Sequence, residues 1–424
     1  MLFTKRFLPL FTVQFLGAFN DNVFKNALVM LITFQMANNA AEIGLLITLA
    51  AGLFILPFFL FSATAGKIAD SYNKTKLIQK IKLAEILIML MGAFAFWLQD
   101  LTLLFTVLFL MGLQSTFFGP IKYAILPEHL SEDELLTGNG WFSASTFVSI
   151  LFGTIIGGFL VLTDGGMVWL SGLIVLLSTL GYGVSLMIPP SIVPAKKLPF
   201  SLNFAKTTWQ EIKRARQYPQ AFFAILAISW FWFLGATYLS QMPIIVKELI
   251  FADEQVVLLF LATFSVGIAI GAFIVNIMNI IVRKMADIAW LALLLFGISI
   301  AMALLNLMIG MIEKTEIPLS IENFVVSYPP LAILALLAII AVLGGMYIVP
   351  LYTLLQVQTP QGSRSRMVAV NNITNAVFMV VSAILIMVLY TVDYNLVDIF
   401  TLIAVLNFLV FIWFYTRTKY EISL

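Results

Sequence analysis

The first apolar segment of the chain contains the stretch Phe19-Asn20-Asp21-Asn22-Val23-Phe24-Lys25-Asn26, which places an acid, a base and three amides inside a predicted membrane span. An ionisable residue at the centre of a span costs roughly 2.5–3.5 kcal/mol or more, so it indicates a function by default. On an α-helix, Gln14, Asp21 and Lys25 fall on one stripe, which Asn22 and Asn26 border. The stretch therefore predicts a helix with one polar face.

Two interpretations of this polar face remain open. In the first, Asp21 and Lys25 neutralise each other inside a helix bundle and contact nothing else. In the second, the face lines a binding cavity. The neighbouring amides Asn20, Asn22 and Asn26 favour the second interpretation, because a pair that only neutralised itself would not need them.

The composition is that of an integral membrane protein. Hydrophobic residues make up 62% and charged residues 10% of the chain, against roughly 45–50% and 25% in soluble domains. The chain has no cysteine, which excludes disulfides, thiol catalysis and Cys-based metal sites, and the lone His129 cannot form a metal cluster by itself. We expect no cofactor. The net charge of +2 is spread between the spans, so no basic patch indicates nucleic acid.

Apolar runs near the length of a bilayer crossing recur along the chain, which predicts an all-α membrane protein with twelve transmembrane helices. The predicted spans cover residues 8–36, 42–65, 78–98, 101–124, 139–162, 167–188, 221–245, 254–281, 286–311, 330–356, 367–391 and 394–416. With a cytoplasmic N-terminus, all but Lys25, Lys247 and Lys314 of the 23 Lys and Arg residues lie on or near the cytoplasmic side. This orientation satisfies the positive-inside rule and places both termini in the cytoplasm.

The longest predicted connection divides the chain into two halves. Residues 1–188 form one predicted six-helix bundle and 221–424 the other, with 189–220 as a cytoplasmic linker. The linker carries Trp209, Ile212 and Lys213 at helical spacing. It is either a basic amphipathic helix on the inner membrane surface or a solvated connection, and both remain open.

The connection after the second span resembles the loop signature of the major facilitator superfamily. Gly66, Asp70 and Lys74 match this signature, whereas Ser71 stands where the signature has a base and Asn73 where it has a glycine. Asn tolerates a left-handed backbone better than most residues. The resemblance implies a fold of two six-helix bundles and a gating role for this loop. We expect Asp70 to accept hydrogen bonds from a helix N-terminus.

Three stretches in the first 160 residues are similar to the lysophospholipid transporter family within that superfamily. They contain Gln14-Phe15-Leu16 with Ala18-Phe19 and Asp21-Asn22; Pro120 with Lys122-Tyr123, Ile125-Leu126 and Glu128; and Asn139-Gly140 with Ala144-Ser145-Thr146, which lead into the glycine run Gly153–Gly158. The sequence departs from the stand-alone members at Asn20 and Lys25, which leaves the identity of the headgroup open. Small residues spaced as in the glycine run allow close helix packing.

The resemblance implies a carrier that moves lysophospholipid, typically lysophosphatidylethanolamine, from the outer to the inner leaflet of the bacterial cytoplasmic membrane for re-acylation. Asp21 would bind the ammonium of such a headgroup, and Lys25 or Lys122 its phosphate. Amides suited to glycerol and phosphate oxygens include Asn22, Asn26, Asn371 and Asn375. The expected partners are the lysophospholipid and membrane lipids. Whether a cytoplasmic acyltransferase docks on the protein remains open.

Rival interpretations concern both the chemistry and the substrate. Three roles remain open for Glu85 in the third span: it pairs with Lys25, it serves as a protonation site, or it lies in a polar contact between helices. A proton-coupled exporter of amphipathic drugs would share the fold and could use Asp21 as its proton carrier. An acyltransferase is disfavoured, because His129 is followed at the required spacing by Glu134 rather than Asp, with no nucleophile motif nearby. We expect a transporter and not an enzyme.

Overall fold

The computed structural model describes residues 1–424 except 37–39, 193–197, 199–202, 282–287, 313–317 and 423–424. Its described residues are almost entirely helical, and a single bridge pairs Ala252 with Leu319. The first group of helices is α1 Leu8–Leu31, η1 Ile32–Met36, α2 Ala40–Ser71, α3 Lys74–Leu98, α4 Leu101–Ala124, α5 Leu126–His129, α6 Glu132–Leu162, α7 Gly166–Ser185 and α8 Phe204–Ala215. The second group is α9 Pro219–Ile244, η2 Ile245–Ile250, α10 Glu254–Ile281, α11 Ile288–Gly310, α12 Ile321–Val326, α13 Pro330–Val357, η3 Gln361–Ser363, α14 Arg364–Thr391 and α15 Leu396–Ile422. Lys314 and part of the predicted linker lie outside the described residues.

Eleven helices of the described chain are long and apolar enough to cross a membrane. The predicted first span is α1, which is as long as several of these helices but is not among the eleven. Its polar residues explain the difference, since Asp21, Lys25 and the surrounding amides lower its mean hydropathy. The chain is therefore a multi-pass membrane protein whose first long helix is interrupted by charged and amide side chains.

The predicted loop at 66–76 is mostly helical. α2 continues to Ser71 and α3 begins at Lys74, so only Tyr72 and Asn73 connect the two helices. Asn73 is not left-handed as expected. Its backbone is extended and its side chain caps α3 by accepting a hydrogen bond from the Lys76 amide. An N-cap needs this backbone conformation.

α6 begins at Glu132, well before its predicted span at 139, and its first turn carries three acids. A capping box explains the early start: Ser131 and Glu134 each bond the other's backbone N–H. Asn139 and Gly140, predicted as the first residues of the span, lie two turns inside the helix. The acidic first turn also favours a helix N-terminus.

Contacts divide the chain into two compact units. The first comprises Met1–Ile225 and Leu354–Ala376, and the second comprises Leu226–Thr353 and Val377–Leu424. The end of α13 and the start of α14 thus pack with the first six spans, although they lie far away in the sequence. The predicted division into 1–188 and 221–424 follows the order of the sequence, so it does not place residues 354–376 with the first group of helices.

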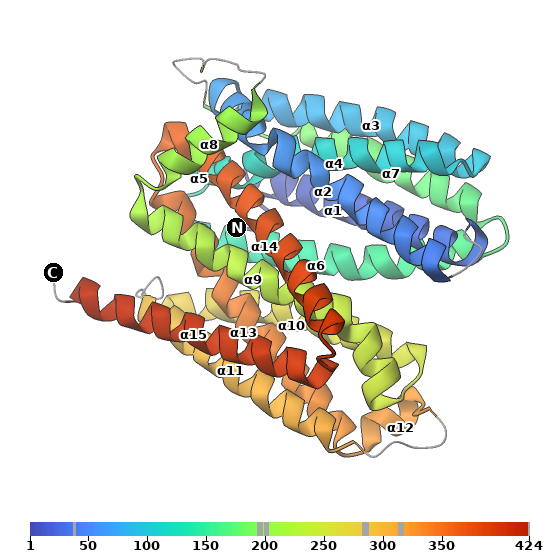
Figure 1. Ribbon diagram of the computed structural model, residues 1–424. Coiled ribbons are helices and arrows are strands. Elements are labelled where there is room, and N and C mark those ends of the chain that lie inside the picture. Colours follow the sequence, from blue (N-terminus) through green and yellow to red (C-terminus); the bar gives the residue numbers. More distant parts are fainter. Residues whose placement is uncertain (37–39, 193–197, 199–202, 282–287, 313–317, 423–424) are drawn as a thin grey trace. The chain divides into compact units, whose positions relative to one another are not determined.

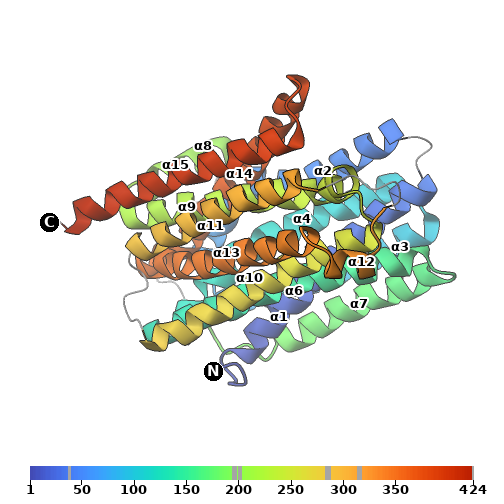
Figure 2. The same cartoon turned by 90° about the horizontal axis from the view of Figure 1, so that it is seen from below.

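Within the first unit, α1, α2, α3, α4, α6 and α7 lie side by side with their long axes nearly aligned (Figures 1 and 2). Glycines bring α6 against α1: a Cβ on Gly157 would lie 2.2 Å from the Val23 carbonyl oxygen, and one on Gly153 would lie 2.6 Å from Asn22 Cβ. The glycine run therefore packs against the polar stretch of α1, as its small residues predict.

In the second unit, α10 and α13 approach each other in the same way. A Cβ on Gly271 would lie 2.0 Å from the Val342 carbonyl oxygen, and one on Gly345 would lie 2.2 Å from the Ile268 carbonyl oxygen. Asn407 of α15 joins the neighbouring α11 by donating hydrogen bonds to the Ser299 hydroxyl and the Leu295 carbonyl oxygen. In lipid, helix association has no hydrophobic driving force, because the lipid tails are as apolar as the side chains. Close backbone packing and interhelical hydrogen bonds from amide side chains stabilise the helix pairs instead.

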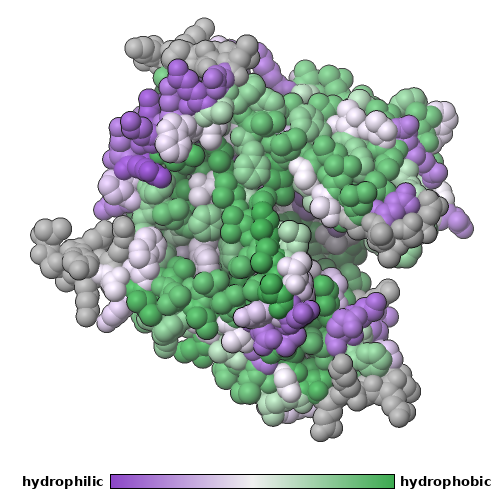
Figure 3. Space-filling view, in the orientation of Figure 1, coloured by the Kyte–Doolittle hydropathy of each residue, from purple (hydrophilic) through white to green (hydrophobic). Residues whose placement is uncertain are grey.

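The segment of the linker with helical spacing forms α8. Its buried side carries Thr207, Glu211 and Ala215, one turn apart, and it packs against α2. Its other side is exposed and includes Trp209 and Lys213. Hydrophilic residues gather over α8 in Figure 3. This alternation of buried and exposed side chains is that of an amphipathic helix.

Candidate functional site

Asp21 and Lys25 lie one turn apart on α1, and both residues are half-buried. Asp21 accepts a 2.7 Å hydrogen bond from the Ser115 hydroxyl of α4. Lys25 lies over the ring of Phe54 on α2, 4.5 Å from its centroid. Among the described residues, no ion pair within 4.0 Å joins Asp21 to Lys25. Their charges therefore interact at longer range, and each residue contacts another group, so the two do not contact each other alone as the first interpretation required.

The amides of the polar face mainly hold helices together. Gln14 donates to the Thr146 hydroxyl of α6 at 2.9 Å, and Asn26 donates to the Thr154 hydroxyl of the same helix at 3.0 Å. Asn22 donates to the Ala18 carbonyl one turn earlier. These bonds use the amide N–H groups, and they fix the rotation of α1 so that Asp21 faces α4.

A buried ion pair lies beside this face and was not predicted from the sequence. Lys82 Nζ is 2.6 Å from Glu85 Oε2 on the same helix, α3. The Gln114 amide donates to Glu85 at 2.9 Å, and the Asn20 amide nitrogen lies 3.4 Å from the other Glu85 oxygen. Glu85 thus pairs with Lys82 and not with Lys25. Lys82, counted from the sequence as a base near the cytoplasm, is fully buried in the bundle.

Gly17 of α1 makes room for this ion pair. A Cβ at Gly17 would lie 2.5 Å from Lys82 Nζ. The spacing of Lys82 and Glu85 by three residues on a helix was the sequence signal for the pair. A base near the start of a span looks like an ordinary flanking charge, which obscured this signal.

Ser115 connects the ion pair to Asp21. Its hydroxyl oxygen lies 2.7 Å from Asp21 Oδ2 and 3.2 Å from Gln114 Oε1. A hydroxyl has one proton to donate, so Ser115 serves Asp21 at the shorter distance or Gln114 at the longer one. A substitution of Asp21 would therefore free the Ser115 hydroxyl to donate to Gln114, whose amide donates to Glu85.

The remaining predicted binding residues lie on α4 and α14. Lys122 is half-buried, with its ammonium 5.2 Å from the centroid of the Tyr123 ring. Asn371 and Asn375 are buried in the part of α14 that belongs to the first unit. Neither side-chain polar atom of Asn371 has a hydrogen-bond partner among the described residues. A buried amide without partners is unusual and calls for a water or a ligand.

Asp70 joins α2 to the N-terminus of α14. Its two carboxylate oxygens accept hydrogen bonds from the Ser365 and Arg366 amides at 3.0 and 3.2 Å, and Arg366 Nε donates to it at 3.0 Å. Gly66 allows the approach, because a Cβ there would lie 2.7 Å from Ala369 Cβ. The expectation that Asp70 would accept hydrogen bonds from a helix N-terminus is confirmed.

Lys74 and Arg366 extend this contact in different directions. Lys74 forms a buried ion pair with Glu128 of α5 at 2.8 Å. Arg366 Nη1 lies 3.8 Å from Glu211 of α8. Burial raises the pKa of the Glu211 carboxyl, and the positive charges of Arg366 and Lys67 offset this only in part.

A second set of bonds also ties the end of α13 to the first unit. Asn139 and Gln356 exchange hydrogen bonds through their amides at 2.7 and 3.0 Å, and Gln356 donates to the Tyr123 carbonyl oxygen at 2.9 Å. All the groups involved are buried. Segment 354–376 is thus joined to the preceding spans both before and after its turn at η3.

Many apolar spans around buried charges and amides define a polytopic helical membrane protein with a polar interior, the class to which membrane transporters belong. The chain belongs to the Major Facilitator Superfamily, whose family model matches residues 10–381. It is a membrane transporter, and two bacterial relatives are similar to it over most of their length. Both are named "Lysophospholipid transporter LplT". The protein of Serratia proteamaculans (strain 568) is 26% identical, with 84% of this chain and 81% of that protein covered. The protein of Yersinia pestis (strain Pestoides F) is 25% identical, with 84% of this chain and 79% of that protein covered.

Solved structures share the fold at low sequence identity. The human organic anion transporter MFSD10 (TETRAN) has a TM-score of 0.70 at 13% identity, with 96% of this chain and 99% of that chain covered. A bacterial homologue of the iron transporter ferroportin in an outward-facing state has a TM-score of 0.68 at 16% identity, with 96% of this chain and 100% of that chain covered. The transporter FucP in the outward conformation has a TM-score of 0.65 at 16% identity, with 97% of this chain and 98% of that chain covered. The predicted major facilitator fold is confirmed.

Proposed function

We propose that this transporter moves lysophospholipid, with lysophosphatidylethanolamine as the preferred substrate, from the outer to the inner leaflet of the bacterial cytoplasmic membrane. The names of the bacterial relatives support the substrate class. One observation carries the proposal: Asp21 and Lys25 are half-buried opposite charges in one span that do not form an ion pair with each other in the described chain. Both charges are therefore available to a ligand that has a charge of each sign.

A phosphoethanolamine headgroup has this charge pattern. Its ammonium suits Asp21, whose carboxylate Ser115 orients. Its phosphate suits Lys25 or Lys122, since each ammonium lies over an aromatic ring and forms no ion pair within 4.0 Å in the described chain. Asn371 would supply a donor and an acceptor that have no other partner there. The amides that position these groups through their bonds to α1 and α6 are Gln14, Asn22 and Asn26.

The contact between Asp70 and α14 is proposed as a gate. It joins the second span to a helix near the end of the chain, and it consists of three hydrogen bonds that a small displacement of α14 would break. Gly66 sets how closely the two helices approach, and Lys74 holds the start of α3 through Glu128. Alternating access requires such a contact to form and break during each cycle.

The proposed orientation places both termini in the cytoplasm. Apart from Lys25, Lys247 and Lys314, the bases lie on or near the side that this orientation makes cytoplasmic. The lysophospholipid would then reach the inner leaflet, where a cytoplasmic acyltransferase could re-acylate it. Because the chain has no cysteine, a single Gln361→Cys change at an exposed position reports the orientation. It should react with an impermeant thiol reagent only from the cytoplasmic side.

Transport in proteoliposomes tests the substrate. Lysophosphatidylethanolamine with a labelled acyl chain is added outside, and its transfer is followed as loss of extraction by albumin. We expect wild-type protein to transfer the lipid and Asp21→Asn to slow the transfer at least tenfold. Asp100→Asn is the matched control, because Asp100 is an exposed N-cap of α4 and Asn is also a good cap.

A second lipid separates headgroup recognition from a general defect. Lysophosphatidylglycerol has the phosphate but no ammonium, so Asp21→Asn should affect its transfer less than that of lysophosphatidylethanolamine. If wild-type protein transferred neither lipid but exported an amphipathic cationic drug, the proposal would be replaced by the drug-exporter function.

A further inference from the structure

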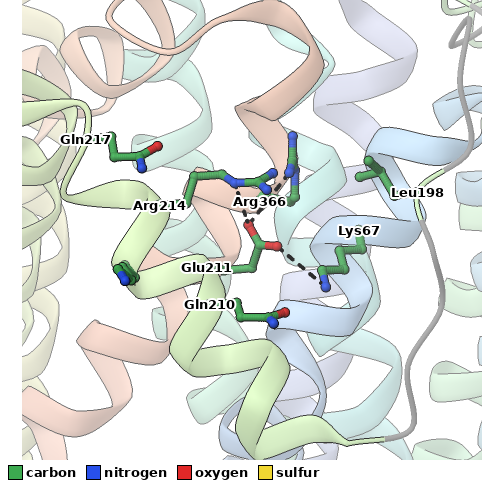
Figure 4. Close-up of a pocket in the computed structure, with 8 residues that line it drawn as sticks. Lys67, Leu198, Gln210, Glu211, Arg214, Gln217 and Arg366 are labelled. Atoms are coloured by element: carbon green, nitrogen blue, oxygen red, sulfur yellow. Dashed lines mark ion pairs between the residues drawn. The ribbon is translucent and has the colours of Figure 1, made fainter.

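A cavity of about 410 Å³ opens where α8, the last turns of α2 and the first turn of α14 meet. Lys67 of α2, Lys213 and Arg214 of α8, and Arg366 of α14 line it. In Figure 4, Glu211 points from α8 toward Lys67, Arg214 and Arg366. The described lining includes none of the residues assigned above to substrate binding. The cavity is therefore separate from the proposed substrate site, and it shares Arg366 with the contact between Asp70 and α14.

The positive charge of this cavity is not balanced. Its described lining contains four basic side chains and one acid, Glu211. The ion pairs of Glu211 with Lys67, Arg366 and Arg214 measure 3.6, 3.8 and 3.9 Å, longer than the roughly 2.7–2.9 Å of a direct charge-assisted hydrogen bond. Glu211 Oε2 is buried and accepts no hydrogen bond from the described chain.

The other nearby acid does not supply the missing charge. Asp70 is bonded to the N-terminus of α14 and to Arg366 Nε. Arg366 Nη2 donates to the Gly362 carbonyl and to Ser363, which leaves Nη1 directed at Glu211. Lys213 is exposed and has no ion pair among the described residues. An excess of cationic donors thus faces an open space.

We infer that this cavity binds a phosphate-bearing anion, either free in solution or as the phosphate of an anionic phospholipid headgroup. Guanidinium groups match phosphate oxygens with paired donors, and lysine adds point charges. The amides of Gln210 and Gln217, which also line the cavity, offer further donors. The volume lies within the range of ligand sites, roughly 300–1,000 Å³.

The exposed side of α8 is compatible with the lipid source. Trp209 is 64% exposed and lies one turn after Lys206 and one turn before Lys213. Tryptophan and basic residues together favour the interface of an anionic membrane. This inference does not rest on the identity of the transported substrate, because its residues and its test are separate from the transport site.

Binding to purified, delipidated protein in a nonionic detergent tests the inference. One arm titrates inorganic phosphate at constant ionic strength, with chloride as the balancing anion, and follows Tm. The other adds phosphatidylglycerol and counts bound lipid by native mass spectrometry. We expect saturable binding in at least one arm. Saturation by inorganic phosphate identifies a free anion as sufficient, whereas binding of phosphatidylglycerol alone identifies the lipid headgroup as the ligand.

Two double variants assign the binding to the cavity. Lys213→Gln with Arg214→Gln removes two lining cations and should weaken binding at least tenfold. Lys76→Gln with Lys80→Gln removes the same charge from exposed positions outside the described lining and should change Kd less than twofold. Lys213→Gln alone should weaken binding severalfold even if the double variant does not fold. No saturable binding in either arm, or an equal loss in the control, would overturn the inference.

Discussion

Among the pairs of opposite charges in the first unit, two have contrasting surroundings. Lys82 and Glu85 are buried, are bonded to each other and have further amide partners. Asp21 and Lys25 are half-buried and are not bonded to each other in the described chain. A buried pair that satisfies itself holds a structure together, whereas charges held apart by other groups retain the capacity to bind. The difference predicts that mutations at the first pair affect stability and that mutations at the second affect transport.

The largest expected effect comes from breaking the buried pair. Glu85→Ala would leave Lys82 charged and without its partner, which should destabilise the protein by about 3–5 kcal/mol. Lys82→Met with Glu85→Gln removes both charges and keeps an acceptor for Gln114, so it should recover at least half of that loss. Unfolding of the purified protein, followed by tryptophan fluorescence in a denaturing detergent, measures both. A double variant as unstable as the single one would show that the pair does more than neutralise itself.

The second effect concerns the transport charges. Asp21→Asn and Lys25→Met should each slow lysophosphatidylethanolamine transfer at least tenfold, which corresponds to about 1.4 kcal/mol. Because the two residues bond other groups rather than each other, the double variant should remain slow while its stability stays near that of wild type. The measurement combines transfer rates with the unfolding assay. Recovery of transfer in the double variant would restore the interpretation of a neutralising pair.

The third effect concerns the contact of Asp70 with α14. Asp70→Ala should weaken it by about 1–3 kcal/mol, since hydrogen bonds to a charged group are lost. The chain has no cysteine, so a single reporter at Ala369, which is buried against Gly66, reads opening directly. Labelling of Ala369→Cys should accelerate in the Asp70→Ala background and not with Asp133→Ala, an exposed acid. Equal labelling in both backgrounds would count against a gate here.

The smallest effect is a pH dependence at Glu211. Its pKa is raised in the folded protein, so its contribution favours folding below the ordinary pKa of a glutamate and is lost as the pH rises through the raised value. Acidification from about pH 7 to about pH 5 should therefore raise the Tm of wild-type protein relative to Glu211→Gln. A parallel change in the two proteins would show that Glu211 does not titrate in this range.

The fold was largely predictable because apolar runs report bilayer crossings directly. α10 covers the predicted span 254–281, and α4 the predicted span 101–124. The start of α6 was missed because hydropathy does not detect a helix that continues beyond the apolar run. The pattern of Ser131 followed by Glu134 contained that information as a capping box.

The candidate site was predictable only where the signal was local. The polar face of α1 follows from spacing on one helix, and the expected partner of Asp70, a helix N-terminus, follows from its charge. The hydrogen bond that Ser115 donates to Asp21 spans 94 residues, and the one that the Ser365 amide donates to Asp70 spans 295. A sequence pattern does not encode such long-range pairings, and for the same reason the packing of segment 354–376 with the first unit was not foreseen.

The polarity of α1 also bears on how the chain is assembled during synthesis. A charged residue near the middle of a helix opposes insertion by roughly 2.5–3.5 kcal/mol. The groups that offset this penalty are made later: Ser115 follows Asp21 by 94 residues and Thr154 follows Asn26 by 128. Because α1 precedes α4 and α6 in the chain, these hydrogen bonds form only after both later helices have been synthesised. We therefore expect the stable burial of the polar face of α1 to depend on the arrival of α4 and α6.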